Sequence, residues 1–140
     1  MPFNRADRRA ILRLGGTALA TIGTAGCLQS RSSTDRTVTM TGGFGFDPEA
    51  TTIAPGRTVT WKNTSDVDHT VTASEAELPD GATYFASGGF ESERAARNTL
   101  TAGLIEPTSE YERTFEVPGT YHYYCIPHES SGMLGTVQVE

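Results

Sequence analysis

The 140-residue sequence predicts an all-β domain, built as a sandwich of two sheets. Three observations carry this prediction. Polar and apolar residues alternate with a period of two in several short stretches, as they do in half-buried strands. Residues that favour turns (Pro, Gly, Asn and Asp) separate these stretches. Helical periodicity is almost absent, so the chain lacks the helices that a parallel α/β fold needs.

The predicted elements follow in chain order. Strands are expected at residues 37–40, 58–61, 70–72, 111–117, 121–125 and 135–139. One short helix is expected at residues 91–98, inside a loop-like interval from 75 to 104. Three segments are typical of turns between antiparallel neighbours: Asp47-Pro48, Ala54-Pro55-Gly56 and Val117-Pro118-Gly119.

The overall charge is acidic, with 17 Asp and Glu residues against 11 Lys and Arg residues. This balance argues against nucleic acid as a partner. Residues 1–26 hold four arginines and one aspartate, so the chain without them has a net charge of −9. An acid excess spread from Asp35 to Glu140 is typical of a protein that stays hydrated in high salt; a local acidic docking patch is the alternative.

The first 26 residues have the pattern of an export signal. Arg8-Arg9 and Arg13 precede an uncharged run of small and apolar residues from 14 to 26, which is too short to span a bilayer. The pattern resembles a twin-arginine signal. We therefore expect residues 1–26 to direct export and to be removed.

The segment that follows resembles the lipobox of bacterial and archaeal lipoproteins. It reads Thr24-Ala25-Gly26-Cys27, with Thr24 where a large apolar residue is usual. The resemblance implies a lipid on Cys27 and a tether at residues 27–36. Nine extended residues reach at most about 30 Å, so the domain at residues 37–140 would stay near the extracytoplasmic face of the cell membrane. A disulfide between Cys27 and Cys125 is the alternative.

Candidate metal ligands gather near the C-terminus. The segment Cys125-Ile126-Pro127-His128 and Met133 offer a thiolate, an imidazole and a thioether within nine residues. This set suits copper in both oxidation states, whereas zinc prefers four firm ligands without a thioether. His69 supplies a second imidazole if the packed sheets bring its loop to the same end. Three histidines and two cysteines allow one mononuclear site at most.

The pattern of His69, Cys125, His128 and Met133 resembles that of plastocyanin-type blue copper proteins, including their Cys-x-Pro-His-x4-Met loop. The resemblance covers residues 37–140, and the acidic, lipobox-bearing chain is most similar to the halocyanins of halophilic archaea. It implies a cupredoxin-type Greek-key sandwich of about eight strands. One departure is Thr70, where plant plastocyanins carry an asparagine that braces the site.

The resemblance implies an electron carrier rather than an enzyme, with one Cu(I)/Cu(II) ion of type 1. The expected partners are a redox donor, a redox acceptor and, through the lipid, the membrane; we expect a monomer. Electrons would pass through His128, within apolar surface formed by Ile126, Pro127, Gly132 and Leu134. An exported copper storage or delivery protein is the alternative function, and a metal-free immunoglobulin-like module is a third.

Each candidate residue also has a structural interpretation. His69 is then an ordinary surface histidine, Cys125 a buried thiol and Met133 a core filler. His122 is expected not to bind metal, because strand alternation turns it away from Cys125. Tyr121 is expected to be a corner tyrosine that ties its strand to the preceding loop.

Overall fold

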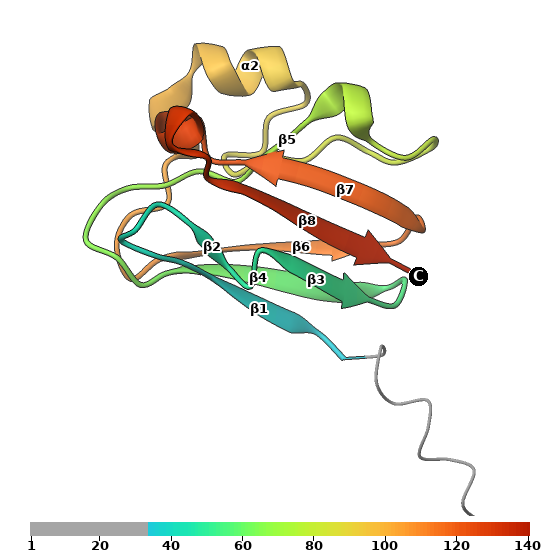
Figure 1. Ribbon diagram of the computed structural model, residues 1–140. Helices are drawn as coiled ribbons and strands as arrows, with labels where there is room; N and C mark the ends of the chain where they lie inside the picture. The colour runs from blue at the N-terminus through green and yellow to red at the C-terminus, as the bar shows by residue number, and fades with distance from the viewer. Residues whose placement is uncertain (1–33) are drawn as a thin grey trace, which may run out of the picture. The chain divides into compact units, whose positions relative to one another are not determined.

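The computed structural model describes residues 34–140, so the predicted export signal, Cys27 and most of the predicted tether lie outside the described part. Within it, eight strands form two four-stranded sheets (Figure 1). Sheet A has the order β2 (Phe46–Asp47), β1 (Arg36–Met40), β4 (Arg57–Asn63) and β6 (Glu110–Phe115). Sheet B has the order β3 (Ala50–Ile53), β8 (Leu134–Val139), β7 (Gly119–Tyr124) and β5 (Thr72–Ala73). The predicted all-β sandwich is confirmed.

The three turn segments do turn the chain, but each carries it from one sheet to the other. Asp47-Pro48 leads from β2 to β3, Ala54-Pro55-Gly56 from β3 to β4, and Val117-Pro118-Gly119 from β6 to β7. The expectation that they join antiparallel neighbours is therefore wrong. Because the chain changes sheets at these points, β1 runs parallel to β4 and β3 runs parallel to β8.

Two strands, β2 and β3, have no counterpart among the predicted strands. The two residues of β2 are too few to show a period of two. In β3 the inward-facing position next to Ile53 is a threonine, Thr51, which is only 8% exposed. A buried polar residue hides the alternation on which the prediction depends.

The segment predicted as a strand at 70–72 is a regular strand only at Thr72 and Ala73. Before that, the chain pairs with Ser87, inside the 75–104 interval, and with Ile105, just after it, rather than with a neighbouring strand. His69 and Ile105 exchange backbone hydrogen bonds, and Ser87 bonds to both the backbone N–H and the C=O of Val71. This pairing fixes the loop just before β5.

The core lies between the sheets and centres on Trp61 of β4, which is fully buried. Its indole contacts four aromatic rings at centroid distances of 5.2–6.4 Å, those of Phe85, Tyr111, Phe115 and Tyr123. Such pairs each add about 0.5–1.5 kcal/mol beyond the burial of apolar area. Gly135 of β8 lies under the ring of Tyr123, which occupies the place of a side chain there. Aromatic packing thus holds together the two sheets, whose loops carry the predicted metal ligands.

Strand β7 has the predicted register. Tyr121 and Tyr123 are buried in the core, while His122 is exposed on the outer face of sheet B. The hydroxyl of Tyr121 donates to the carbonyl of Val117 at 2.6 Å, which confirms the corner role. Tyr124 shares the outer face with His122 but is buried, because a helix covers it.

That helix is α2 (Glu93–Asn98), close to the predicted 91–98, and Ser92 caps its first turn by accepting from the N–H of Ala95. Three 3₁₀ helices were not expected: η2 (Glu75–Glu77), η3 (Leu100–Gly103) and η4 (Ile126–Ser131). Figure 1 shows α2 over sheet B, at the same end as η4. Among residues 34–140, no helix has the length and apolar character needed to cross a membrane.

Candidate metal centre

Three of the predicted ligands meet at one end of the sandwich. The ligand atoms of His69, Cys125 and His128 all lie within 4.8 Å of one another, and they form the one such group found among residues 34–140. The sulfur of Cys125 is 3.7 Å from Nδ1 of His69 and 3.3 Å from Nδ1 of His128. His69 and Cys125 are fully buried, so His69 is no surface histidine.

Met133 lies at the end of the same loop and is fully buried. Its carbonyl accepts from the N–H of Cys125 at 3.1 Å, and its N–H donates to the carbonyl of His128 at 3.3 Å. The loop closes through Gly132, whose φ of +84° is left-handed and favours glycine. These bonds bring Met133 back beside the other two loop residues, and its sulfur as the fourth ligand stays a prediction.

The orientation of His69 is set by the polar turn at residues 63–66, whose bonds to this histidine the sequence did not predict. Ser65 Oγ lies 3.0 Å from Nε2 of His69 and donates to Oδ1 of Asn63 at 2.7 Å. Since the serine hydroxyl proton points to Asn63, its oxygen accepts from an Nε2–H of the imidazole. This tautomer leaves Nδ1 without a proton, facing Cys125.

Asn63 itself is nearly fully buried and is held by the backbone. Its Nδ2 donates to the carbonyls of Val67 and Ile105, each at 2.8 Å. The sequence signal was an Asn two residues before a Ser at the end of a strand, which is typical of an Asx turn. That signal indicates a turn, but it does not indicate that the turn bonds to a ligand.

Thr70 braces the site from the other side. Its N–H donates to the sulfur of Cys125 at 3.4 Å, and its Oγ1 accepts from the N–H of Ile126 at 2.8 Å. The same Oγ1 lies 3.2 Å from the hydroxyl of Thr72. The threonine that departs from the plant plastocyanin pattern thus ties together the two loops that carry the ligands.

Burial sets the protonation of the metal-free site. It lowers the pKa of His69, with a further contribution from neighbouring His128, and it lowers the pKa of His128. It raises the pKa of the Cys125 thiol. Two neutral imidazoles and a protonated thiol carry no net charge, so a cation that displaces the thiol proton meets no repulsion. One soft thiolate and two imidazoles fit copper.

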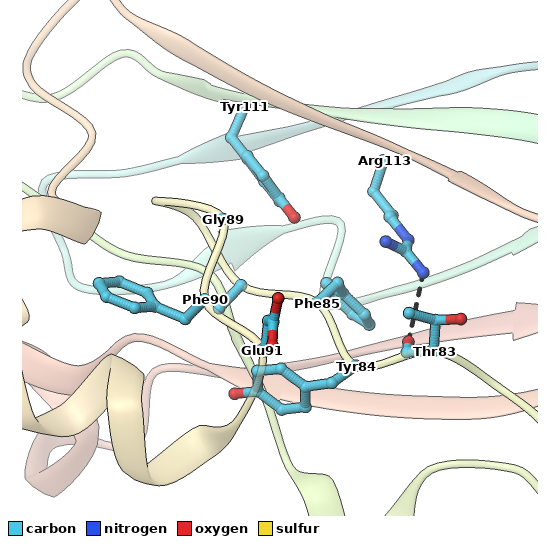
Figure 2. Close-up of a pocket in the computed structure, with 9 residues that line it drawn as sticks. Thr83, Tyr84, Phe85, Gly89, Phe90, Glu91, Tyr111 and Arg113 are labelled. Atoms are coloured by element: carbon cyan, nitrogen blue, oxygen red, sulfur yellow. Dashed lines mark hydrogen bonds between the residues drawn. The ribbon is translucent and has the colours of Figure 1, made fainter.

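A pocket lies on the flank of the sandwich, and its lining includes none of His69, Cys125 and His128. It has a volume of about 450 Å³ and lies between residues 83–91 and β6 (Figure 2). Arg113 closes one side, with its guanidinium 5.2 Å from the ring of Phe85 and one N–H donated to the carbonyl of Thr83. No predicted metal ligand lines it, so this pocket takes no part in metal binding.

Known proteins match the chain over the same region. Residues 33–140 fit the family of copper binding proteins described as the plastocyanin/azurin family. A plastocyanin from Scenedesmus fuscus is 34% identical over 99 residues, which cover 71% of this chain and 90% of that protein. A chloroplastic plastocyanin from Silene latifolia subsp. alba is 31% identical over 137 residues, covering 96% of this chain and 78% of that protein.

Solved structures agree on the fold. A purple cupredoxin from Nitrosopumilus maritimus superposes with a TM-score of 0.55 at 23% identity, covering 76% of this chain and all of that one. A mutant plastocyanin of a fern superposes with a TM-score of 0.53 at 25% identity, covering 74% of this chain and 99% of that one. The chain therefore belongs to the plastocyanin/azurin family of copper-binding proteins, whose members carry electrons on one copper ion and are not enzymes.

Proposed function

We propose that this protein is a lipid-anchored blue copper electron carrier of the halocyanin kind, which passes single electrons between redox partners at the extracytoplasmic face of the cell membrane. The observation that carries the proposal is the group of one thiol and two imidazoles at one end of the sandwich, in which His69 and Cys125 are buried and His128 is half-buried. His69, Cys125 and His128, with the sulfur of Met133, would hold a copper ion there, and that ion would supply a one-electron couple. Ser65, Asn63 and Thr70 hold these ligands in position.

Rigidity is what the protein contributes to fast transfer. The ring of His69 is held by Ser65 and Asn63, and the two ligand loops are joined by Thr70. Residues held in this way change position little when the charge of the site changes, so little reorganisation opposes the electron. His69 and Cys125 are fully buried, so solvent has no direct access to these two side chains.

His128 is the ligand that reaches the surface, and an apolar side chain lies on it. Phe44, which is 37% exposed, stacks on its ring at a centroid distance of 4.2 Å. Phe44 has a φ of +60°, a left-handed conformation that a bulky residue rarely adopts. A strained backbone that aims an apolar ring at a ligand supports a docking surface here, formed by Phe44 together with Ile126, Pro127 and Gly132 of the predicted apolar surface.

Leu134 does not belong to this surface, although the sequence analysis placed it there. It pairs with Tyr124 across β7 and β8, on the outer face of sheet B, where it lines a shallow concavity with His122 and Glu77. A residue that directly follows a ligand-loop position in the sequence is turned to another face by strand alternation. Leu134 is 50% exposed and so offers a matched control for Phe44.

The test of docking compares two variants of the copper-loaded protein. Phe44→Asp and Leu134→Asp both replace an exposed apolar side chain by a carboxylate. We expect Phe44→Asp to slow bimolecular electron transfer at least about tenfold at molar salt, where charge steering is screened within about 3 Å, while Leu134→Asp transfers at the wild-type rate. Equal rates in the two variants would contradict docking at His128.

The copper-loaded protein also distinguishes an electron carrier from a copper storage or delivery protein. An electron carrier shows intense blue absorption and a reversible one-electron wave, whereas a storage or delivery protein hands copper to a chelator and shows neither.

The anchor is tested in cells. Export and lipidation are supported by the basic and apolar pattern of residues 1–26 and by the lipobox-like sequence before Cys27. Cys27→Ser should move the protein from the membrane fraction to the soluble fraction while its blue spectrum stays unchanged. A Cys27→Ser protein that remains with the membrane would contradict the lipid anchor. Size-exclusion chromatography of residues 28–140 tests the expected monomer.

A further inference from the structure

The 75–104 interval is tied to β5 at one end and carries α2 at the other. Glu75 and Glu93 are joined reciprocally: the N–H of Glu75 donates to Oε1 of Glu93, and the N–H of Glu93 donates to Oε1 of Glu75, each at 3.0 Å. Tyr84 adds a bond from its hydroxyl to the carbonyl of Ala73 at 2.9 Å. These contacts fix the start of α2 against sheet B.

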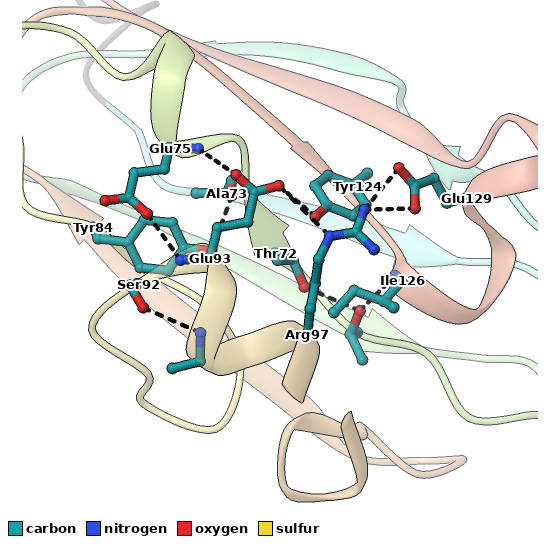
Figure 3. Close-up of polar contacts among 12 residues, drawn as sticks. Thr72, Ala73, Glu75, Tyr84, Ser92, Glu93, Arg97, Tyr124, Ile126 and Glu129 are labelled. Carbon is teal, nitrogen blue, oxygen red and sulfur yellow. Dashed lines mark hydrogen bonds and ion pairs between the residues drawn. The ribbon is translucent and has the colours of Figure 1, made fainter. Parts of the chain in front are cut away.

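From this fixed position, α2 bonds to the chain neighbours of two ligands (Figure 3). Oε2 of Glu93 accepts from the hydroxyl of Tyr124 at 2.5 Å. Arg97 Nη2 donates to both carboxylate oxygens of Glu129, at 2.7 and 2.9 Å. Tyr124 directly precedes Cys125, and Glu129 directly follows His128. The helix therefore holds the ligand loop on both sides of the segment that carries these two ligands.

The contacts are coupled to one another through Arg97. Its guanidinium lies over the ring of Tyr124, 5.1 Å from the centroid, and its Nε is 3.9 Å from Oε2 of Glu93. A single exposed ion pair contributes little to stability. Here one arginine meets two carboxylates and an aromatic face, and such a network is worth more than its separate pairs.

The outer turn of the loop has few other restraints. Within the described residues, Arg97 is the one side chain from outside η4 that hydrogen-bonds to a side chain of residues 129–131. The bonds of Thr70 and Met133 act at the two ends of the loop. The stretch between them is exposed, apart from the ring of His128 under Phe44.

We propose that Glu93, Arg97, Tyr124 and Glu129 form a clamp by which the 75–104 interval positions the ligand loop. Arg97 and Glu93 act as positioning residues: they touch no ligand, but they order the loop before copper binds and hold the geometry of the site afterwards. The effect on the geometry of the copper site rests on the proposed function. The effect on the order of the metal-free loop does not. Loop order in the metal-free protein is therefore the primary test.

The experiment measures amide hydrogen exchange in residues 126–133 of the metal-free protein. Arg97→Gln and Glu129→Gln should each speed exchange in this loop roughly two- to fivefold, the change that follows from the loss of an ion pair at a partly exposed site. Arg94→Gln is the matched control, because it removes the same charge from an exposed position of the same helix. Arg97→Lys should restore part of the protection.

The double variant separates a clamp from two independent effects. If Arg97 acts through Glu129, the variant with both changes exchanges no faster than either single one. Additive effects, or equal exchange in Arg97→Gln and Arg94→Gln, would overturn the proposal. Denaturant midpoints measured in parallel show whether the loop loosens alone or with the whole fold, and a loss of protection spread evenly over the sandwich would also contradict a local clamp.

The copper-loaded variants give a second readout. A purely Coulombic influence on the metal would move the reduction potential in opposite directions in Arg97→Gln and Glu129→Gln, because one change removes a positive charge and the other a negative one. A loosened loop moves the reduction potential in the same direction in both variants, and that common direction is the result expected. A wild-type protein without blue colour would refute the proposed function while leaving the exchange result standing.

Discussion

The ring of Phe44 lies nearly flat on the imidazole of His128, with the ring centroids 4.2 Å apart and the planes inclined by 14°. The contact joins the turn after β1 to the ligand loop, at opposite ends of the described chain. It covers one face of a ligand ring that would otherwise meet water, and burial lowers the pKa of His128. The stack thus joins the proposed docking surface to His128.

Removal of this ring should change the titration of His128. In metal-free Phe44→Ala we expect the pKa of His128 to rise toward its ordinary value of 6.5, because water reaches the exposed imidazole. NMR titration of the ring protons measures this shift. Phe44→Leu is the control, since it keeps an apolar cover and should leave the pKa near that of the wild type. A pKa unchanged in Phe44→Ala would show that other groups bury His128.

Copper uptake should release a proton from Cys125. Burial raises the pKa of this thiol, so it is protonated at neutral pH and must lose its proton to bind the metal. We expect release of about one proton per copper at pH 7–8, and an apparent affinity that rises about tenfold per pH unit. Titration in a weakly buffered indicator solution measures both quantities.

Cys125→Ser is the control for this release. A hydroxyl does not ionise in this range and cannot supply the charge transfer from thiolate to copper. We therefore expect a folded sandwich that releases no proton and shows no blue band. A serine variant that stays intensely blue would refute the assignment of Cys125.

Thr70→Val should destabilise the protein, because it removes a hydroxyl that accepts from the N–H of Ile126 and lies 3.2 Å from the hydroxyl of Thr72. Valine keeps the shape but leaves the N–H of Ile126 unpaired, which costs about 1–3 kcal/mol of unfolding free energy. The N–H of Thr70 that donates to Cys125 is retained, so the blue spectrum should persist. Thr52→Val in β3 is the control. It has no hydrogen bond from its hydroxyl among residues 34–140, and its expected change is within about 0.5 kcal/mol. Equal urea midpoints in the two variants would contradict the bracing role.

Buried tyrosines should make the metal-free fold sensitive to alkali. Burial raises the pKa of Tyr111 to about 12 from its ordinary value of 10.0, and it also raises those of Tyr84, Tyr123 and Tyr124. Between pH 10 and 12 the unfolded chain therefore binds fewer protons than the folded one, and stability falls as the pH rises. Each such tyrosine contributes a slope of about 1.4 kcal/mol per pH unit.

Urea unfolding between pH 8 and 11 checks this slope. Stability should begin to decline near pH 9, because the thiol of Cys125 ionises more readily in the unfolded chain than in the folded one. It should fall more steeply above pH 10, where the tyrosines add to the slope, and Tyr111→Phe should lessen this steeper part. Absorbance of tyrosinate locates the ionisation itself. A folded protein whose stability is flat to pH 11 would show that these hydroxyls do not differ between the two states.

Local patterns in the sequence were enough to predict much of this molecule. Alternation with a period of two identified the stretches around β1, β4, β6, β7 and β8. It also predicted that His122 lies on the outer face of its strand. The donors of Cys125, His128 and Met133 lie within nine residues, so their chemistry is visible without a structure. Alternation failed where a strand has two residues, as in β2, and where a buried threonine interrupts it, as in β3.

Only the tertiary structure decided which segments far apart in the chain contact one another. The sequence around His128 does not indicate that Phe44 covers its ring, and the sequence around Glu129 does not indicate that Arg97 binds it. The sequence by itself determined which residues offer copper-binding donors and where the strands β1, β4, β6, β7 and β8 run, because donor chemistry and side-chain alternation are local properties. The packing of the sheets and of the 75–104 interval decided what holds those ligands, because a hydrogen bond or a stack between distant segments depends on their positions in space and leaves no periodic trace in either segment.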